Sequence, residues 1–247
     1  MLMSFSAGNK SYSFDAGKYH NLTIAIRKGD NVNCYYLDDP AFSYFSNEQF
    51  TGSLKAGGSV NCEKISFYAH ASGTHTECAL HVLDVPFSMK DIDMPLLQLC
   101  RLVSIRPVER GGDKVIDKNA FDALTNDEGA TAVCIRTLPN DADKLHRHYA
   151  GTNPPYFTPA AVLKLKALGF RHLLTDLPSI DREEDEGKLA AHKDWFAENG
   201  VVTEQRTITE FIYAPENIPD GMYAVSIACP QIETDAVVSK VLLYPCV

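Results

Sequence analysis

The sequence has no apolar run long enough to cross a bilayer, so we do not expect a membrane protein. Met1 to Tyr19 lacks a charged segment followed by an apolar one, which predicts no signal peptide. There is no CxxC pair, and the seven scattered cysteines suit reduced thiols better than a disulfide framework. Basic residues are also scarce. The 23 Lys and Arg against 32 Asp and Glu give a net charge of -9, which disfavours nucleic acid or an anionic membrane as the main partner. We therefore expect a cytoplasmic protein.

Neither a repeat nor a linker divides the 247 residues, so we expect one domain over residues 1–247. Many strand patterns and few helix patterns predict an α+β or mixed sheet-and-barrel domain. The clearest helix pattern has Thr158 as its cap, Pro159 at its first position and Gly169 as its stop. A second helix is expected at 188–198 and a short one at 117–124. The expected strands are 22–27, 33–37, 64–70, 79–85, 102–108, 131–136, 170–175, 201–208, 222–228 and 237–244.

The stretch from His70 to His81 carries three of the eight histidines and one acidic residue. His75, Glu77 and His81 share parity, so an extended chain would direct all three to one side. Two imidazoles and a carboxylate there would suit a borderline divalent metal such as zinc. Gly73 would let the backbone pass close to another element just before this set. The alternative is an edge strand whose polar face meets water.

A second pair of candidates lies far downstream. His192 falls on the apolar stripe of the second expected helix, and Glu204 falls on the inward face of strand 201–208. A buried carboxylate without partners is costly, so such residues are usually paired or bound to metal. The alternative is that neighbours such as Lys188 or Arg206 satisfy them. From the residues alone, a metal site is indicated but no reaction can be named.

These residues resemble a known pattern. Residues 73–81, GTHTECALH, are similar to the motif His-x-Gly-Thr-His-x-Asp-x-x-x-His of the metal-dependent cyclase-like hydrolases, a family that includes bacterial kynurenine formamidase and isatin hydrolase. His192 and Glu204 reproduce the family's helix histidine followed twelve positions later by a glutamate. Residues 178–181, Pro-Ser-Ile-Asp, resemble the segment before that helix. The likeness spans roughly residues 20–245.

The resemblance implies a swivelling β/β/α fold and metal-assisted hydrolysis of a formamide-like amide or a cyclic acyl bond in a small molecule, as in an arylformamidase. His75, Glu77, His192 and Glu204 match metal ligands, and His81 matches the histidine that acts as general base and then as acid. The ion, zinc by first expectation and manganese as the alternative, would lower the pKa of its bound water and polarise the carbonyl. His81 would then move the proton to the leaving group. The resemblance also implies a homo-oligomer.

Two positions depart from the family pattern. Glu77 stands where the family has aspartate, and the family's first motif histidine falls on Ala71. His70 comes one position early, so in a strand it would face the opposite side unless a bulge turned it back. Either the site holds fewer ions than a two-metal relative, or His70 replaces the lost ligand. A second class of function also stays open, namely a non-catalytic metal- or ligand-binding protein of the same fold.

Overall fold

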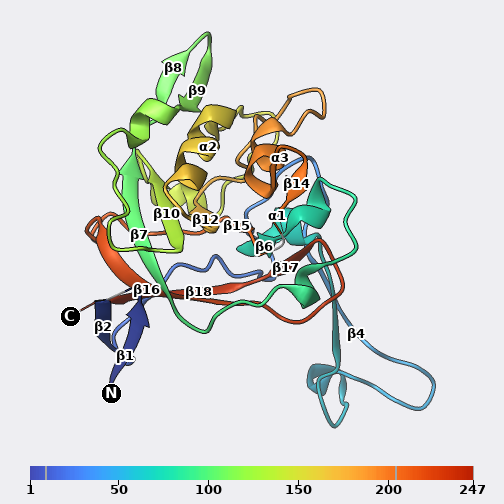
Figure 1. Cartoon of the computed structure of the whole chain (residues 1–247). Helices are drawn as coiled ribbons and strands as arrows, with labels where there is room; N and C mark the ends of the chain where they lie inside the picture. The colour runs from blue at the N-terminus through green and yellow to red at the C-terminus, as the bar shows by residue number, and fades with distance from the viewer. Residues whose placement is uncertain (9, 204, 247) are drawn as a thin grey trace.

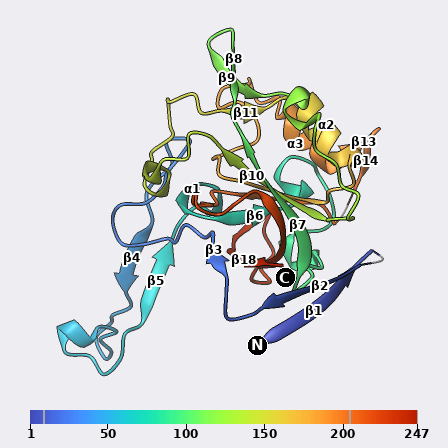
Figure 2. The same cartoon turned by 90° about the vertical axis from the view of Figure 1, so that its left-hand side faces the viewer.

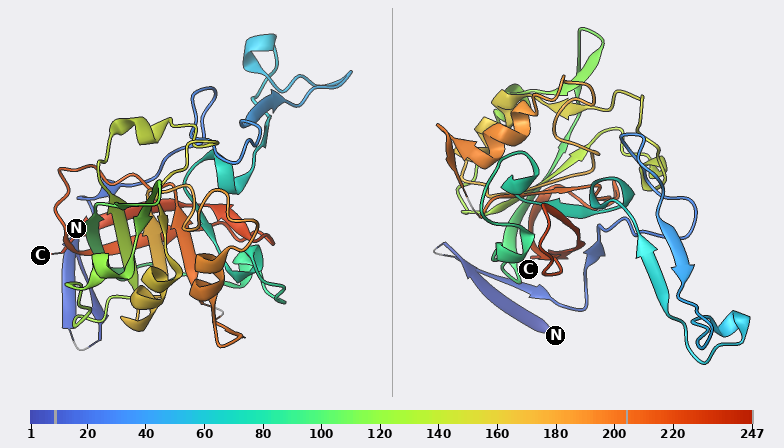
Figure 3. Two further views of the ribbon diagram at one scale, coloured as in Figure 1. Left: turned by 90° about the horizontal axis from the view of Figure 1, so that it is seen from above. Right: turned by 90° about the vertical axis from the view of Figure 1, so that its right-hand side faces the viewer.

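A curled, nine-stranded mixed sheet forms the centre of the computed structural model, which describes residues 1–8, 10–203 and 205–246 (Figure 1). The strand order is β17-β6-β15-β12-β10-β7-β16-β18-β3. β15, β12, β10 and β7 are neighbours and run parallel to one another. The strands on both sides of this block, β6 and β16, run antiparallel to it. The expected α+β class with a mixed, barrel-like sheet is confirmed (Figure 3).

The central sheet is built from short strands. Its members are β3 (His20–Asn21), β6 (His75–Glu77), β7 (Gln98–Ile105), β10 (Ala132–Thr137), β12 (His172–Thr175), β15 (Thr207–Glu210), β16 (Gly221–Ala228), β17 (Ala236–Val238) and β18 (Lys240–Pro245). Smaller sheets join β1 (Leu2–Ala7) to β2 (Lys10–Asp15), β4 (Ala41–Tyr44) to β5 (Glu63–Ser66), β11 (Tyr156–Phe157) to β9 (Asp113–Ile116) and β8 (Val108–Arg110), and β13 (Ala197–Glu198) to β14 (Val201–Val202). The α-helices are α1 (Ala69–Ser72), α2 (Pro159–Ala167) and α3 (Ala190–Phe196). Single 3₁₀ turns are η1 (Leu54–Ala56), η2 (Ala79–His81), η3 (Met89–Asp91), η4 (Lys118–Phe121) and η5 (Ala142–Leu145).

Helices α2 and α3 pack together over one face of the parallel strands (Figure 1). α2 begins as the sequence predicts, because the Thr158 hydroxyl accepts a hydrogen bond from the Ala161 amide and Pro159 occupies the first turn. Trp195 of α3 is fully buried in the core that this face shares with Val133 and Leu173. Burial of the whole helical face, rather than helix propensity, holds such short helices in place.

The opposite face of the same strands lines the inside of the curl. Residues alternate along each strand, so Ala132 and Cys134 of β10 face this side while Val133 faces the helices. They pack with Leu174, and with apolar residues of β16 and β18 that close the curl. β10 and β12 are thus buried on both faces along their whole length, although His172, Thr175, Arg136 and Thr137 at their ends are polar.

Several expected strands are absent or shorter. Residues 22–27 form only an isolated bridge at Thr23, because their backbone bonds go to different elements: the Leu22 amide to Val241 and the Ile24 amide to the Thr74 hydroxyl. Residues 33–37 likewise form a single bridge, between Asn33 and His148. The strand expected at 79–85 was wrong, since this stretch begins with the 3₁₀ turn η2. Nothing in local sequence shows such long-range bonds, which explains these errors.

A long hairpin, β4 and β5 with η1 between them, projects away from the body of the molecule (Figure 2). It exposes large apolar side chains, including Phe45, Leu54, Ile65 and Phe67. We call it the β4–β5 arm. Within residues 1–8, 10–203 and 205–246, no helix combines the length and hydropathy that a membrane crossing requires.

Candidate metal centre

Four histidines and four carboxylates from separate elements meet at one end of the parallel strands. Strand β6 supplies two of them and lies between β15 and β17, with His75 opposite Glu210 of β15. The turns on either side of β6, α1 and η2, supply one histidine each, and α3 supplies another. Asp181 comes from the loop before α3, and Asp235 directly precedes β17. We call this set the histidine–carboxylate cluster: His70, His75, Glu77, His81, Asp181, His192, Glu210 and Asp235.

Glu77 lies at the centre of the cluster and is completely buried. Its Oε1 is 3.0 Å from His192 Nε2, and its Oε2 is 3.3 Å from His70 Nδ1 and 3.8 Å from His81 Nε2. Glu210 forms a second focus, with Oε2 3.3 Å from His75 Nε2 and Oε1 3.7 Å from His192 Nε2. Each of the four imidazoles therefore turns one nitrogen toward these two carboxylates.

The other nitrogen of each imidazole is held by a hydrogen-bond partner at the edge of the cluster. His75 Nδ1 lies 3.1 Å from the Gly73 carbonyl oxygen, and His192 Nδ1 lies 2.6 Å from Asp181 Oδ2. A single oxygen, Asp235 Oδ2, lies 2.8 Å from His70 Nε2 and 3.1 Å from His81 Nδ1. Carbonyl and carboxylate oxygens only accept, so each outer nitrogen donates its proton, and in the neutral imidazole that a metal requires the inner nitrogen would carry the lone pair. This orientation is typical of metal-ligating histidines.

Several buried polar atoms at the focus have no hydrogen-bond partner within the described part of the chain. They are His75 Nε2, His192 Nε2 and both carboxylate oxygens of Glu77. Leaving such atoms unpaired is costly, and a native structure with four of them in one place calls for a missing partner. Nitrogen and oxygen donors in tetrahedral or slightly larger sets suit zinc. The donor set therefore fits a divalent cation.

Donor atoms also come close enough for an ion to bridge them. In three groups, one donor atom from each residue lies within 4.8 Å of the others: His70 with His75 and Glu77, Glu77 with His81 and His192, and His70 with His81 and Asp235. His75, Glu77 and His192 are fully buried, whereas the side chains of His70 and His81 are 23% and 27% exposed. A small molecule would therefore reach the cluster from the side of His70 and His81.

The charges of the cluster favour a cation. Burial alone would lower the pKa of His192, but Glu77, Asp181 and Glu210 outweigh it and raise that pKa well above its usual value. Burial likewise opposes ionisation of Glu77, yet His192, His81 and His70 hold its pKa well below the usual range. Against the effect of burial, Asp235 and Glu77 raise the pKa of His70 to about 10. Protons thus balance the carboxylates here, and a metal ion that displaced them would serve the same purpose.

Close packing positions the first strand of the site. A β-carbon on Gly73 would lie 2.8 Å from the Ile24 carbonyl oxygen, so only glycine permits this approach, as the sequence predicts. The next residue, Thr74, accepts a hydrogen bond from the Ile24 amide and donates one to the Phe211 carbonyl oxygen. These contacts fix the entry of the chain into β6 one residue before His75.

The structure brings together five of the six site residues that the sequence singles out: His70, His75, Glu77, His81 and His192. Glu204 lies outside the described residues. His81 reaches the cluster from a 3₁₀ turn rather than from the expected strand. The parity argument for it was therefore wrong, although His81 does lie beside Glu77.

His70 faces the cluster, but not through a β-bulge. Residues 69–72 form the helical turn α1, so the argument that assigned His70 to the far side of a strand does not apply. Ala71, at the position of the family's first histidine, is fully buried against Ile24, Cys34 and Phe211. The turn therefore places His70, and not residue 71, beside Glu77.

Sequence reasoning missed three carboxylates. Glu210 ends the fully buried strand β15, and a carboxylate in such a strand was the available signal. Asp181 lies in the Pro-Ser-Ile-Asp segment that carries the family likeness, but no role was assigned to it. No local pattern marks Asp235.

Comparisons with known proteins identify the family and the fold. The family model Cyclase, described as "Putative cyclase", matches residues 20–182. No curated protein matches the chain. Among solved structures, a potential metal-dependent hydrolase with cyclase activity is 21% identical with a TM-score of 0.67, over 92% of this chain and 97% of that one.

Two further solved structures are similar. A predicted metal-dependent hydrolase from Bacillus stearothermophilus is 21% identical with a TM-score of 0.64, covering 92% of this chain and 98% of that one. An isatin hydrolase bound to the product analogue thioisatinate is 13% identical with a TM-score of 0.68, covering 92% of each chain. At these identities the likeness establishes the fold, while the family model covers well over half of the sequence. The chain therefore belongs to the cyclase family.

Proposed function

We propose that this chain is a metal-dependent hydrolase that cleaves a formamide-like amide or a cyclic acyl bond in a small molecule. The observation that carries the proposal is Glu77, a buried carboxylate whose two oxygens face the inner ring nitrogens of His70, His81 and His192. Such a set has no evident structural purpose without a cation, because apolar residues of the same volume would be less costly to bury. The solved relatives described as metal-dependent hydrolases support the same reading.

The residues that would hold a divalent metal are His75, Glu77, His192, Glu210 and His70, with His70 and His75 grouped on one side of Glu77 and His192 on the other. The majority of nitrogen donors favours zinc over manganese. We infer that His70 replaces the ligand missing at Ala71, since its Nδ1 faces Glu77 at 3.3 Å. When bound, a divalent ion would supply Lewis acidity to the substrate carbonyl and acidify water.

His81 is the proposed proton carrier. Its Nε2 faces Glu77 at 3.8 Å, too far for a good hydrogen bond, and its ring is among the more exposed of the cluster. With Nδ1 donating to Asp235, Nε2 keeps a free lone pair that can take a proton from water and return it to the leaving nitrogen or oxygen.

Asp235 acts as a positioning residue for two histidines at once. Because one carboxylate oxygen accepts from both His70 Nε2 and His81 Nδ1, it fixes complementary tautomers: one inner nitrogen free for an ion and the other free for proton transfer. The two rings are stacked with centroids 4.2 Å apart, so a change at Asp235 would disturb both together.

Metal analysis combined with a substrate panel tests the proposal. The purified protein, with and without added zinc, would be assayed by proton release on formamides, cyclic imides and lactones. His192→Gln should lose bound metal and turnover together. His172→Gln is a matched control, because His172 is also buried and hydrogen-bonded, to Thr207, but lies outside the cluster. Bound metal with no turnover on any class would favour the non-catalytic binding protein instead.

A further inference from the structure

A second cavity, separate from the histidine–carboxylate cluster, lies at the carboxyl ends of three neighbouring parallel strands. Arg106 directly follows β7, Leu138 directly follows β10, and Leu177 comes two residues after β12; all three line the cavity. Its volume is about 750 Å³, within the range of small-molecule sites. In parallel α/β sheets, ligands bind outside the carboxyl ends of the strands. None of the eight cluster residues lines it.

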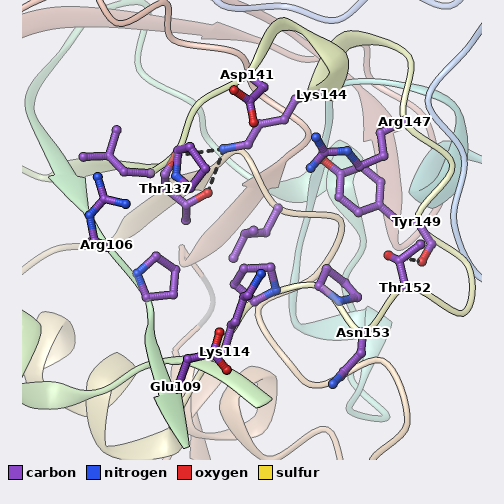
Figure 4. Close-up of a pocket in the computed structure, with 16 residues that line it drawn as sticks. Arg106, Glu109, Lys114, Thr137, Asp141, Lys144, Arg147, Tyr149, Thr152 and Asn153 are labelled. Carbon is purple, nitrogen blue, oxygen red and sulfur yellow. Dashed lines mark hydrogen bonds between the residues drawn. The ribbon is translucent and has the colours of Figure 1, made fainter. Parts of the chain in front are cut away.

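Cations outnumber carboxylates around this cavity, although acidic residues dominate the chain as a whole. Four basic side chains line it, Arg106, Lys114, Lys144 and Arg147, against the two acidic residues Glu109 and Asp141 (Figure 4). An excess of positive charge at one cavity, in a protein of net charge -9, marks it as a site for an anion.

The four cations are not equivalent. Lys144 is buried and its ammonium donates to the Asp176 carboxylate, to Asn140, and to the carbonyl and hydroxyl of Thr137. An ammonium has three protons, so this group is fully used in holding the wall of the cavity. Lys114 stands opposite Glu109 in the β8–β9 hairpin, where the two charges offset each other.

The other two cations, Arg106 and Arg147, lie on opposite sides of the cavity (Figure 4). Neither forms an ion pair within residues 1–8, 10–203 and 205–246. Arg147 is half-buried, and its guanidinium lies 5.6 Å from the centre of the Tyr149 ring, a cation–π contact that holds it in place. The Tyr149 hydroxyl is buried and donates to no acceptor in the described chain. The Arg147 guanidinium is thus held in a fixed position, and its hydrogen-bond donors face no carboxylate of the described residues.

Apart from the charged residues, the wall combines the polar Thr137, Thr152 and Asn153 with a rigid apolar part. Proline fixes its own φ angle, so prolines form walls that change little when a ligand enters. Six apolar residues make up these walls: Pro107, Leu138, Pro139, Pro154, Pro155 and Leu177. Together with the Tyr149 ring they would cover a flat hydrophobic body.

We propose that this cavity binds a small organic carboxylate with a flat apolar body, anchored by Arg147. The guanidinium fork matches the two oxygens of a carboxylate, and Arg106 adds attraction from the opposite side. The site would be a second ligand site of the protein, independent of the histidine–carboxylate cluster.

Titration calorimetry with benzoate tests the proposal, with neutral benzamide as a ligand of the same shape. The protein would be measured as purified and again after treatment with a chelator, so that binding at a metal is separated from binding here. We expect benzoate to bind in both forms, at least about tenfold tighter than benzamide, since hydrogen bonds to charged groups are the stronger ones. Arg147→Gln should weaken benzoate at least about tenfold, Arg147→Lys less, and Arg106→Gln by a few-fold.

The control variant is Arg27→Gln, because Arg27 is an exposed arginine, as Arg106 is, but lies outside the cavity. It should leave benzoate binding unchanged. Equal affinity for benzoate and benzamide, unchanged binding in Arg147→Gln, or benzoate binding that disappears with the chelator would each overturn the proposal. Binding of inorganic phosphate without benzoate would overturn the assignment to an organic carboxylate. The Arg147→Lys and Arg106→Gln variants keep the test decisive if Arg147→Gln does not fold.

Discussion

Asp181→Asn should separate the folding role of the cluster from its metal role. Asp181 accepts three buried hydrogen bonds: from the Ala191 amide at 2.8 Å, the His192 amide at 2.9 Å and His192 Nδ1 at 2.6 Å. It thereby caps the start of α3 and orients the imidazole on that helix. Asparagine has the same shape but only one accepting oxygen, and its amide group would face a donor on the other side.

The magnitude follows from these contacts. Asparagine can keep one or two of the three bonds to Ala191 and His192, and each bond to a charged group contributes about 1.5–3 kcal/mol. We expect Asp181→Asn to lower the free energy of unfolding of the metal-free protein by about 2–4 kcal/mol in urea. Loss of the partner that orients a ligating histidine typically weakens metal binding about 10–100-fold, which a competition titration with a chelator would measure.

Asp185→Asn is the matched control. Asp185 lies in the same loop and accepts backbone hydrogen bonds from Gly187, Lys188 and Leu189, but it does not touch the cluster. We expect it to lower the free energy of unfolding by about 1 kcal/mol and to leave metal affinity unchanged. If Asp181→Asn loses stability but keeps full metal affinity, His192 is not a ligand held by Asp181 and the reasoning fails.

Three further predictions concern single side chains. His81→Ala should retain the metal and the fold but lose roughly 10²–10⁴ in turnover, measured on whichever substrate the panel identifies; loss of metal would make His81 a ligand instead. Asp235→Asn should reduce both metal affinity and turnover, because it disturbs His70 and His81 together; an effect on kcat alone would contradict the shared role. Burial, with help from Arg171 and Arg206, lowers the pKa of His172 from 6.5 to about 4. His172 is therefore protonated at a higher pH in the unfolded chain than in the folded chain. Its contribution to the free energy of unfolding should drop by about 2 kcal/mol between pH 7.5 and 5. His172→Gln should remove that part of the pH dependence in urea unfolding, and an unchanged dependence would refute it.

The parts of the fold that the sequence predicts well are those whose signals are local. α2 was predicted because Thr158, Pro159 and Gly169 mark its ends by their own backbone chemistry. The strands β10 and β12 were predicted because 131–136 and 170–175 are short strand patterns with apolar residues at their centres, Val133 to Ile135 and Leu173 with Leu174. In each case the information lies within a dozen residues.

The parts that escaped prediction depend on contacts between distant segments. His81 was placed on a strand by parity, but β6 ends at Glu77 and the chain turns once before His81. Glu210 was overlooked because strand 201–208 was read as one unit, whereas β14 ends at Val202 and β15 begins only at Thr207. Asp235 reaches the site only because β17 pairs with β6. Pairing of this kind is set by the whole fold and not by local sequence.

The family resemblance supplied what local patterns could not. It joined His75 and Glu77 to His192 across more than a hundred residues, and the structure places His192 Nε2 3.0 Å from Glu77. The ligand roles of these residues and of Glu204 stay predictions. The resemblance did not show which residue takes the place of the histidine missing at Ala71. The helical turn α1 places His70 in the site from the neighbouring position.

Anomalous diffraction at the zinc absorption edge, from crystals of the protein as purified and supplied with zinc, tests the central claim most directly. The account predicts a peak about 2.0–2.3 Å from a carboxylate oxygen of Glu77 and from the ring nitrogens grouped with it, that of His192 on one side or those of His70 and His75 on the other. A cluster without any peak, in crystals whose zinc lies only at surface residues, would contradict it.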